Sequence, residues 1–204
     1  MKITSVRLFD EKELIGRLKN LTMLEDENLY PYRDAYISVE KICVEELHPP
    51  QRYVLKSELM KVRELKWRLE DHEIDIFDLK GFVRLTLEGS KEPVDLLPPV
   101  VEEIVEKNGR ITHIINDGMH RIYAAYLEWA IPRVVYVRGL PRKVPYYAFA
   151  IPERDWTKIE LRDDIPSTYI KKWHRIERNK TLYRNFNSVF SNVGGPRGNP
   201  SKKE

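Results

Sequence analysis

Apolar side chains recur along the chain at two periods, one near 3.6 residues and one near two. The clearest helical pattern covers residues 55–69, where leucines and a valine follow at intervals of three or four residues and charged side chains fill the other face. A shorter helix is predicted after Asp10, because Glu13 three residues later completes a capping box. It places Leu14, Ile15 and Leu18 inward.

A third helix is predicted to begin near Met119 and to end before Pro132. Four residues at helical spacing form its predicted inward face: Ile122, Ala125, Tyr126 and Trp129. Strand-like stretches lie on both sides of it. The predicted strands are Met1–Leu8, Ala35–Val44, Phe82–Leu87, Val100–Glu106, Arg110–Ile115, Arg133–Val137 and Tyr146–Ile151.

The stretch Val100–Lys107 also suits a helix, because Pro99 precedes it and Gly109 follows it. We favour a hairpin, since Asn108-Gly109 between two apolar runs is a strong turn signal. These elements predict an α+β fold in which a small mixed β-sheet carries packed helices. We expect four regions: an N-terminal extension (1–35), a core (36–151), a C-terminal helical extension (152–193) containing a helix over Tyr169–Phe186, and a disordered basic tail (194–204).

Composition excludes several classes of protein. The 204 residues include one cysteine, Cys43, so an internal disulfide and a cysteine-based zinc cluster are excluded within one chain. No apolar run approaches the roughly 18 residues that a membrane-spanning helix needs. The charged residues Lys2, Arg7 and Asp10 at the N-terminus are untypical of a signal peptide. We therefore expect a cytoplasmic protein without membrane contact.

Charge is unevenly distributed, because residues 171–204 carry nine lysines and arginines against two glutamates. This composition makes contact with nucleic acid through residues 171–186 possible. The alternative is a solvated end of the chain.

The most informative stretch runs from Ile114 to Ala125, where a strand, a tight turn at Asp117-Gly118 and a helix N-terminus follow one another. Free backbone amides at a helix N-terminus form an anion site. His120 and Arg121 place cations there, which is unfavourable unless an anion such as phosphate binds. Asp117 could hold Mg²⁺ or accept a proton. Alternatively, Asp117 caps the helix and Arg121 pairs with a nearby carboxylate.

The run Asp117-Gly118-Met119-His120-Arg121, followed by Tyr-Ala-Ala, resembles the Asp-Gly-x-His-Arg signature of the ParB/sulfiredoxin superfamily. That superfamily includes partition nucleotidases, sulfiredoxins and free-serine kinases. The resemblance covers roughly residues 36–140. It implies that the phosphates of a nucleoside di- or triphosphate lie on residues 118–121 and that Arg52 reaches the same phosphates.

The resemblance also implies a catalytic role for Asp117 and His120, with Mg²⁺ held through Asp117. Glu58 is a candidate for the glutamate that activates the acceptor hydroxyl in the kinases, or is an ordinary solvated helix residue. Sulfinic-acid reduction is not expected, because Met119 stands where sulfiredoxins need a nucleophilic cysteine.

The leading hypothesis is therefore a nucleotidase or phosphotransferase dependent on ATP, ADP or CTP. Kinase-like transfer of a terminal phosphate to a small hydroxyl acceptor is the favoured reaction, and such an enzyme should tolerate deletion of residues 187–204. One alternative is a ParB-like nucleic-acid-binding or nuclease-like protein that uses its basic C-terminal segment. Another is a non-catalytic interaction module.

Overall fold

The computed structural model of the chain describes residues 2–106, 108–141, 144, 156–165 and 179–193. Three α-helices lie in this part: Glu11–Leu18 (α1), Lys56–Glu70 (α2) and Met119–Leu127 (α3). The strands are Ile3–Phe9 (β1), Thr22–Met23 (β2), Tyr36–Lys41 (β3), Tyr53–Leu55 (β4), Phe82–Leu87 (β5), Val94–Leu96 (β6), Val100–Val105 (β7), Ile111–Asp117 (β8), Arg133–Arg138 (β9), Glu160–Arg162 (β10) and Arg184–Asn185 (β11). Short 3₁₀ turns cover Val44–Glu46, Trp156–Lys158, Asn179–Leu182 and Phe186–Ser188. The predicted α+β class is confirmed.

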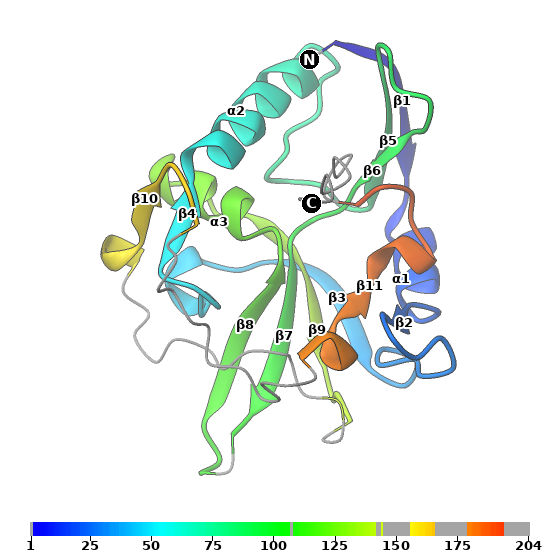
Figure 1. Ribbon diagram of the computed structural model, residues 1–204, viewed down its shortest axis with the longest axis vertical. Helices are drawn as coiled ribbons and strands as arrows, with labels where there is room; N and C mark the ends of the chain where they lie inside the picture. The colour runs from blue at the N-terminus through cyan, green and yellow to red at the C-terminus, as the bar shows by residue number, and fades with distance from the viewer. Residues whose placement is uncertain (1, 107, 142–143, 145–155, 166–178, 194–204) are drawn as a thin grey trace, which may run out of the picture.

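The central sheet has the strand order β3-β9-β7-β8 and mixes antiparallel pairs with one parallel pair, β7 with β9. The hairpin predicted around Asn108-Gly109 is β7–β8, and Figure 1 shows it extending away from α2 and α3. The register of β7 and β8 shifts at the open end of the hairpin, where β8 leads into α3. Ile115 pairs with Val101 and Asp117 pairs with Val100, so Asn116 is an extra residue in β8. This β-bulge bends β8 immediately before the Asp117-Gly118 turn.

A second sheet, β1-β5-β6, is built from the first strand of the chain and a hairpin from its middle. Phe9 of β1 pairs with Phe82 of β5, and their rings stack with centroids 4.3 Å apart. The predicted helix start after Asp10 is confirmed, since Asp10 Oδ1 accepts from the Glu13 amide at 2.8 Å and α1 begins there. The Glu13 carboxylate accepts from Arg17 at 3.0 Å, so of the capping box only the Asp10 half is confirmed.

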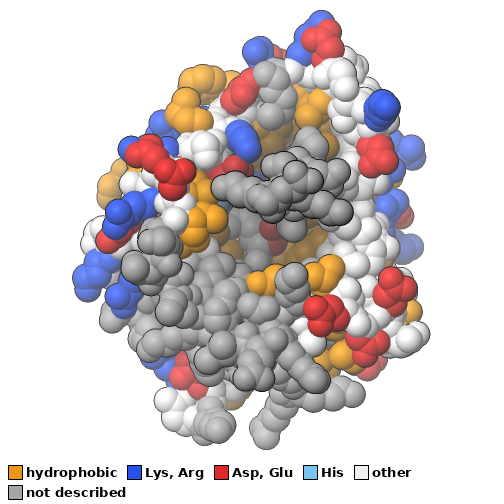
Figure 2. All heavy atoms as spheres, in the orientation of Figure 1, with side chains coloured by type: hydrophobic (Ala, Val, Ile, Leu, Met, Phe, Trp, Pro, Cys, Tyr) orange, Lys and Arg blue, Asp and Glu red, His pale blue; other side chains and the backbone are white. Residues whose placement is uncertain are grey.

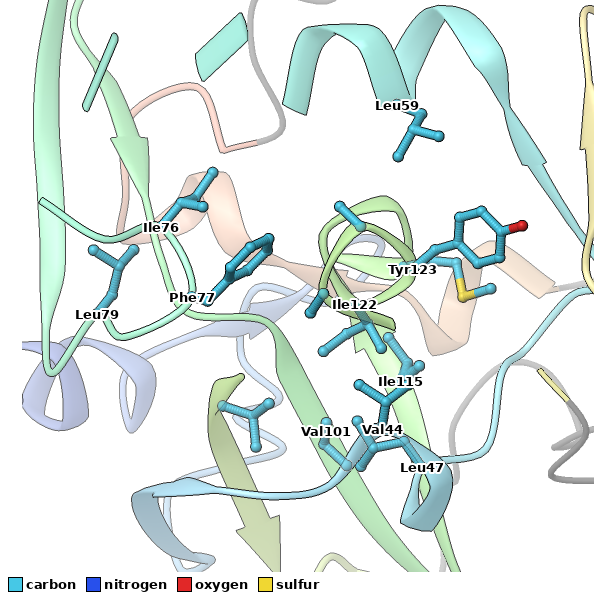
Figure 3. Packing of buried hydrophobic residues seen from close by; sticks show 14 of the residues in the cluster. Val44, Leu47, Leu59, Ile76, Phe77, Leu79, Val101, Ile115, Ile122 and Tyr123 are labelled. Carbon is cyan, nitrogen blue, oxygen red and sulfur yellow. The ribbon is translucent and has the colours of Figure 1, made fainter. Parts of the chain in front are cut away.

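Two hydrophobic cores lie in the described part. In the first, α2 and α3 pack together above the central sheet, and Figure 3 shows Ile122 of α3 between Leu59 of α2 and the sheet residues Val101 and Ile115. In the second, Leu14 and Leu18 of α1 pack with Val135 and Val137 of β9. The neighbouring positions Val134 and Tyr136 belong to the first core. Because successive strand residues face opposite sides, the sheet separates the two cores.

The helix predicted over Tyr169–Phe186 is wrong for the residues that the structure describes. Residues 179–186 form a 3₁₀ turn, the two-residue strand β11 and the start of a second 3₁₀ turn. In Figure 1 this C-terminal segment, residues 179–193, lies beside α1 and β2, and β11 pairs antiparallel with β2. Phe190 and Val193 are buried in the second core. The predicted tolerance to deletion of residues 187–204 is therefore not expected, since the deletion removes core side chains.

The predicted inward position of Trp129 is also wrong. Helix α3 ends at Leu127, and Trp129 follows in a left-handed backbone conformation (φ 55°) with 90% of its surface exposed. Ile122 and Ala125 are buried, as the helical spacing predicts. The strand predicted at Tyr146–Ile151, residues 169–178 of the predicted helix and the tail 194–204 lie outside the described residues. None of the described helices is long and apolar enough to cross a membrane.

Candidate functional site

The five residues Asp117 to Arg121, the signature turn, join the end of β8 to the start of α3, as the sequence predicts. Gly118 is the N-cap residue and has a left-handed φ of 87°. A Cβ atom at this position would lie 2.8 Å from the Cβ of Pro99 and 3.0 Å from its Cα. Both the backbone conformation and the close approach of Pro99 therefore require glycine here.

Arg121 points back toward the start of the turn and is buried. Its Nη2 donates to Asp117 Oδ2 at 2.8 Å, and its Nη1 donates to the carbonyl oxygen of Leu97. Burial lowers the pKa of the Arg121 guanidinium, and the Asp117 carboxylate opposes that shift. Of the alternatives for this turn, the pairing of Arg121 with a carboxylate is confirmed. The capping of α3 by Asp117 is wrong, because Gly118 occupies the cap without a side-chain hydrogen bond.

His120 connects the signature turn to the start of α2. Its Nε2 accepts the backbone N–H of Leu55, the N-cap residue of α2, at 3.1 Å. An imidazole that accepts at Nε2 is neutral and carries its proton on Nδ1. Burial lowers the pKa of His120, although the nearby charges of Glu58 and Asp117 raise it. The Glu58 carboxylate also binds Lys61 Nζ at 2.7 Å.

The electrostatic conflict expected at the start of α3 is resolved within the chain. His120 is neutral, and the positive charge of Arg121 is balanced by Asp117 at 2.8 Å. The argument for a bound anion therefore rests on the backbone rather than on these cations. Neither α3 nor α2 has a side-chain hydrogen bond at its N-cap. Their first amides are without helical acceptors and lie close together, because Leu55 and His120 join the two helices.

The remaining predicted site residues lie near this point in different ways. Met119 is buried in the first core, so its backbone amide rather than its thioether is available to a ligand. Arg52 is exposed immediately before β4, and its carbonyl oxygen accepts from the Glu160 amide at 2.8 Å. The loop that carries Arg52 thus leads directly through β4 to Leu55 and the signature turn.

In the described part of the chain, no group of three or more His, Cys, Asp or Glu side chains is arranged to hold a metal ion. Asp117 nevertheless suits Mg²⁺ in combination with a substrate. Its Oδ2 pairs with Arg121, while Oδ1 makes no hydrogen bond to a described residue. Mg²⁺ commonly binds one or two carboxylates together with substrate phosphates and water. Asp117 would be the protein ligand of such an ion.

A buried polar cluster beside the signature turn was not predicted from the sequence. The Glu102 cluster consists of Tyr32, Glu102, Asn116 and Arg184. Glu102 and Arg184 are fully buried and form a two-pronged ion pair, with Nε–Oε1 at 2.8 Å and Nη2–Oε2 at 3.0 Å. Burial and the charge of Glu102 raise the pKa of Tyr32 well above its ordinary value. The one sequence signal was a glutamate at a position where β7 alternation predicts an apolar residue.

The Glu102 cluster also changes the prediction that residues 171–186 contact nucleic acid. Arg184 belongs to that range, but its charge is taken up by Glu102 in the interior. Residues 171–178 lie outside the described part. On the face in Figure 2, the described basic and acidic side chains are interspersed around the rim and do not gather by sign.

Comparison with known proteins identifies a family. The family model described as the ParB CE domain matches residues 13–160, well over half of the 204 residues. The match includes α2, the signature turn and α3, and it ends before the C-terminal segment. No curated protein and no solved structure matches the chain.

Proposed function

The chain belongs to the ParB CE domain family, and from that premise we propose that it binds a nucleoside di- or triphosphate at the signature turn and acts on its terminal phosphate. Kinase-like transfer to a small hydroxyl acceptor is the reaction that we favour, and hydrolysis differs from it only in using water as the acceptor. The nucleotide is ATP, ADP or CTP, with Mg²⁺ bound between its phosphates and Asp117.

The observation that carries the proposal is the backbone at Gly118. A glycine in the left-handed region begins α3 without a side-chain cap, and the first bond of the helix is from the Ile122 amide to the Gly118 carbonyl oxygen at 2.9 Å. The amides of Met119, His120 and Arg121 therefore have no acceptor within the helix. Such amides, together with the helix dipole, bind phosphate. The start of α2, which the Leu55–His120 hydrogen bond joins to this turn, likewise has no side-chain cap, so its first amides are further donors for a second phosphate group.

In this proposal the side chains of the signature turn have two kinds of role: some support the turn, and others bind the ligand. Arg121 holds Asp117 in place from the buried side, so it supports the turn and the phosphates bind the amides. His120 keeps the starts of α2 and α3 together. Asp117 presents Oδ1 to the metal ion. Arg52, exposed before β4, is the cation that we assign to the outermost phosphate.

Transfer then requires that the acceptor oxygen form a bond to the terminal phosphorus while the bond from phosphorus to the bridging oxygen breaks. The electron pair of the broken bond stays on the leaving nucleotide, and the acceptor proton passes to a protein carboxylate. Glu58 in the first turn of α2 is the candidate for this base, because its charge acts on His120 and so places it beside the signature turn.

The test is a titration of the ¹⁵N-labelled chain with ATP, ADP, CTP and GTP in the presence of Mg²⁺, with the unphosphorylated nucleosides as control ligands. We expect the amide signals of residues 118–121 to shift with one nucleotide and not with its nucleoside. The signal of Gly109, a left-handed glycine at the remote hairpin end, should stay unchanged. If no nucleotide shifted the amide signals of residues 118–121, the proposal would be contradicted.

Turnover is tested separately with Asp117→Asn, which keeps the shape of the side chain and removes its charge. Phosphate release or transfer should fall strongly, on the order of a hundredfold or more, while the nucleotide still binds in the absence of Mg²⁺. Glu58→Gln should lower transfer to an acceptor without weakening nucleotide binding. Equal turnover in wild type and Asp117→Asn would remove Asp117 from the chemistry.

A further inference from the structure

The Glu102 cluster joins the C-terminal segment to the central sheet through one side chain. In the interior, the guanidinium of Arg184 in β11 donates to both oxygens of the Glu102 carboxylate and also to two backbone carbonyl oxygens. The carbonyls belong to Leu182, at 2.8 Å, and Val144, at 2.9 Å. Removing the guanidinium would leave the Glu102 charge buried, which is strongly unfavourable. Arg184 is therefore firmly held, and so is the strand that carries it.

Glu102 passes this constraint to the β-bulge that precedes the signature turn. Its Oε1 accepts from the side-chain amide of Asn116, and the same amide donates to the Tyr32 hydroxyl at 3.1 Å. The Tyr32 hydroxyl in turn donates to Glu102 Oε1 at 2.6 Å. Asn116 is the extra residue of β8, and Asp117 follows it directly. The bulge sets the direction in which β8 leaves the sheet, so the cluster that holds Asn116 also fixes where Asp117 and Gly118 lie.

We propose that Arg184 is a positioning residue for the signature turn: through Glu102 and Asn116, the C-terminal segment holds Asp117 and Gly118 in the geometry that receives the phosphates. The part of this inference that concerns phosphates rests on the function proposed above, whereas the effect on the turn does not. Arg184 lies beyond residues 13–160, so a segment outside the family match completes the site that lies within it.

A second ion pair provides a matched control. Arg84 and Asp95 also form a two-pronged pair, at 2.7 and 2.8 Å, and the Asp95 side chain is fully buried. Asp95 also holds the C-terminal segment, since its Oδ2 accepts from the Ser191 amide at 2.9 Å. This pair lies in the second sheet, between β5 and β6, and does not contact Asn116. Arg84→Lys therefore disturbs the docking of the same segment without touching the bulge.

The experiment compares Arg184→Lys and Arg84→Lys with wild type in two measurements. The first is hydrogen exchange at the Ile122 amide, which bonds to the Gly118 carbonyl oxygen, relative to exchange at the amides of β3, which carries neither ion pair. The second is the dissociation constant for the nucleotide that shifts residues 118–121. For Arg184→Lys we expect relative exchange to speed up, and affinity to fall, by about tenfold each, the scale found when outer supports of a binding site are lost. Arg84→Lys should change neither the relative exchange nor the affinity, even if it lowers the melting temperature as much as Arg184→Lys does.

A milder pair of variants covers the case in which Arg184→Lys does not fold. Tyr32→Phe removes only one hydroxyl group from the Glu102 cluster. Tyr136→Phe removes a hydroxyl that donates at 2.8 Å to Glu103, the residue after Glu102 in β7, and not to a member of the cluster. We expect Tyr32→Phe to speed exchange at Ile122 and Tyr136→Phe to leave it unchanged.

The outcomes separate the two proposals. Equal effects of the two lysine variants on the turn, or of the two phenylalanine variants, would overturn the positioning role of Arg184. Faster exchange at Ile122 in Arg184→Lys, in a protein that binds no nucleotide, would uphold that role and contradict the proposed function alone.

Discussion

Oδ2 of Asp117 accepts a hydrogen bond from Nη2 of Arg121 across 2.8 Å, so the first and last residues of the signature turn hold each other. The pair spans one turn of helix and crosses the N-cap glycine between them. A motif that looks like a row of ligand-binding residues in the sequence thus contains its own support. The backbone amides between the two charges have no acceptor within the helix and are the phosphate donors that we propose.

Removal of Asp117 should destabilise the fold because the Arg121 charge then stays buried with one carbonyl partner. We expect Asp117→Ala to lower the free energy of unfolding by about 2 kcal/mol, less than for a fully buried pair because Asp117 is partly exposed. The double variant Asp117→Ala/Arg121→Met should lose less than the sum of the two single variants. Urea unfolding measures all three. Lys2→Ala, which breaks an exposed pair with Glu88, is the control and should change stability by at most about 0.5 kcal/mol.

The two left-handed glycines of the β7–β8 region should respond differently to alanine. Gly109 has a φ of 82° and open space around it, so Gly109→Ala should cost about 1 kcal/mol for the backbone conformation alone. Gly118→Ala adds a clash with Pro99 at 2.8 Å and should cost about 3 kcal/mol. Thermal or urea unfolding of both variants gives the difference. Equal losses would mean that the Pro99 backbone moves aside freely.

Stability should fall as the pH is lowered through the range in which His120 takes up a proton. Burial lowers the pKa of His120 in the folded chain, so the unfolded chain binds the proton first, near pH 6.5. The stabilisation is complete above that pH and is lost as the pH falls through the lower folded pKa. The variant His120→Gln keeps an acceptor for the Leu55 amide but does not titrate. Its stability should depend less on pH below about 6.5, whereas an unchanged slope would exclude His120 as the source.

Truncation of a side chain in the C-terminal segment should destabilise the whole fold. Phe190 is buried and meets the Phe82 ring edge-on, with centroids 5.3 Å apart. We expect Phe190→Ala to lower the free energy of unfolding by about 3 kcal/mol. Ile165→Ala, at a side chain with 66% of its surface exposed, should have almost no effect. If both variants were as stable as wild type, the C-terminal segment would not be part of the second core.

The sequence predicts the local elements well where one physical signal dominates. The helix start at Asp10, the helical spacing over α2 and the Asn108-Gly109 hairpin each depend on residues within a few positions of one another. The same is true of the turn at Gly118. These signals do not require knowledge of the rest of the chain, and the structure confirms them.

Features that depend on distant partners were not predictable in the same way. Arg184 looks like one of nine basic residues in a charged segment, and nothing near it in sequence shows that Glu102 neutralises it. Trp129 continues the helical spacing of α3, but the helix has already ended at Leu127. The inward orientation of Arg121 also follows only from the position of Leu97, whose carbonyl oxygen accepts from Arg121 Nη1.

The two members of the Glu102–Arg184 ion pair are synthesised at different times, and this affects how the chain can fold while it is being made. Residue 102 leaves the ribosome 82 residues before residue 184. At roughly 5–20 residues per second, that interval lasts on the order of 4–16 s. During that time the carboxylate lacks its Arg184 partner, so closing the sheet over ionised Glu102 would bury an unpaired charge, which is strongly unfavourable. A segment made 82 residues after Glu102 is thus the part that neutralises it, and a nascent chain released before residue 184 would expose the same carboxylate to cellular quality control.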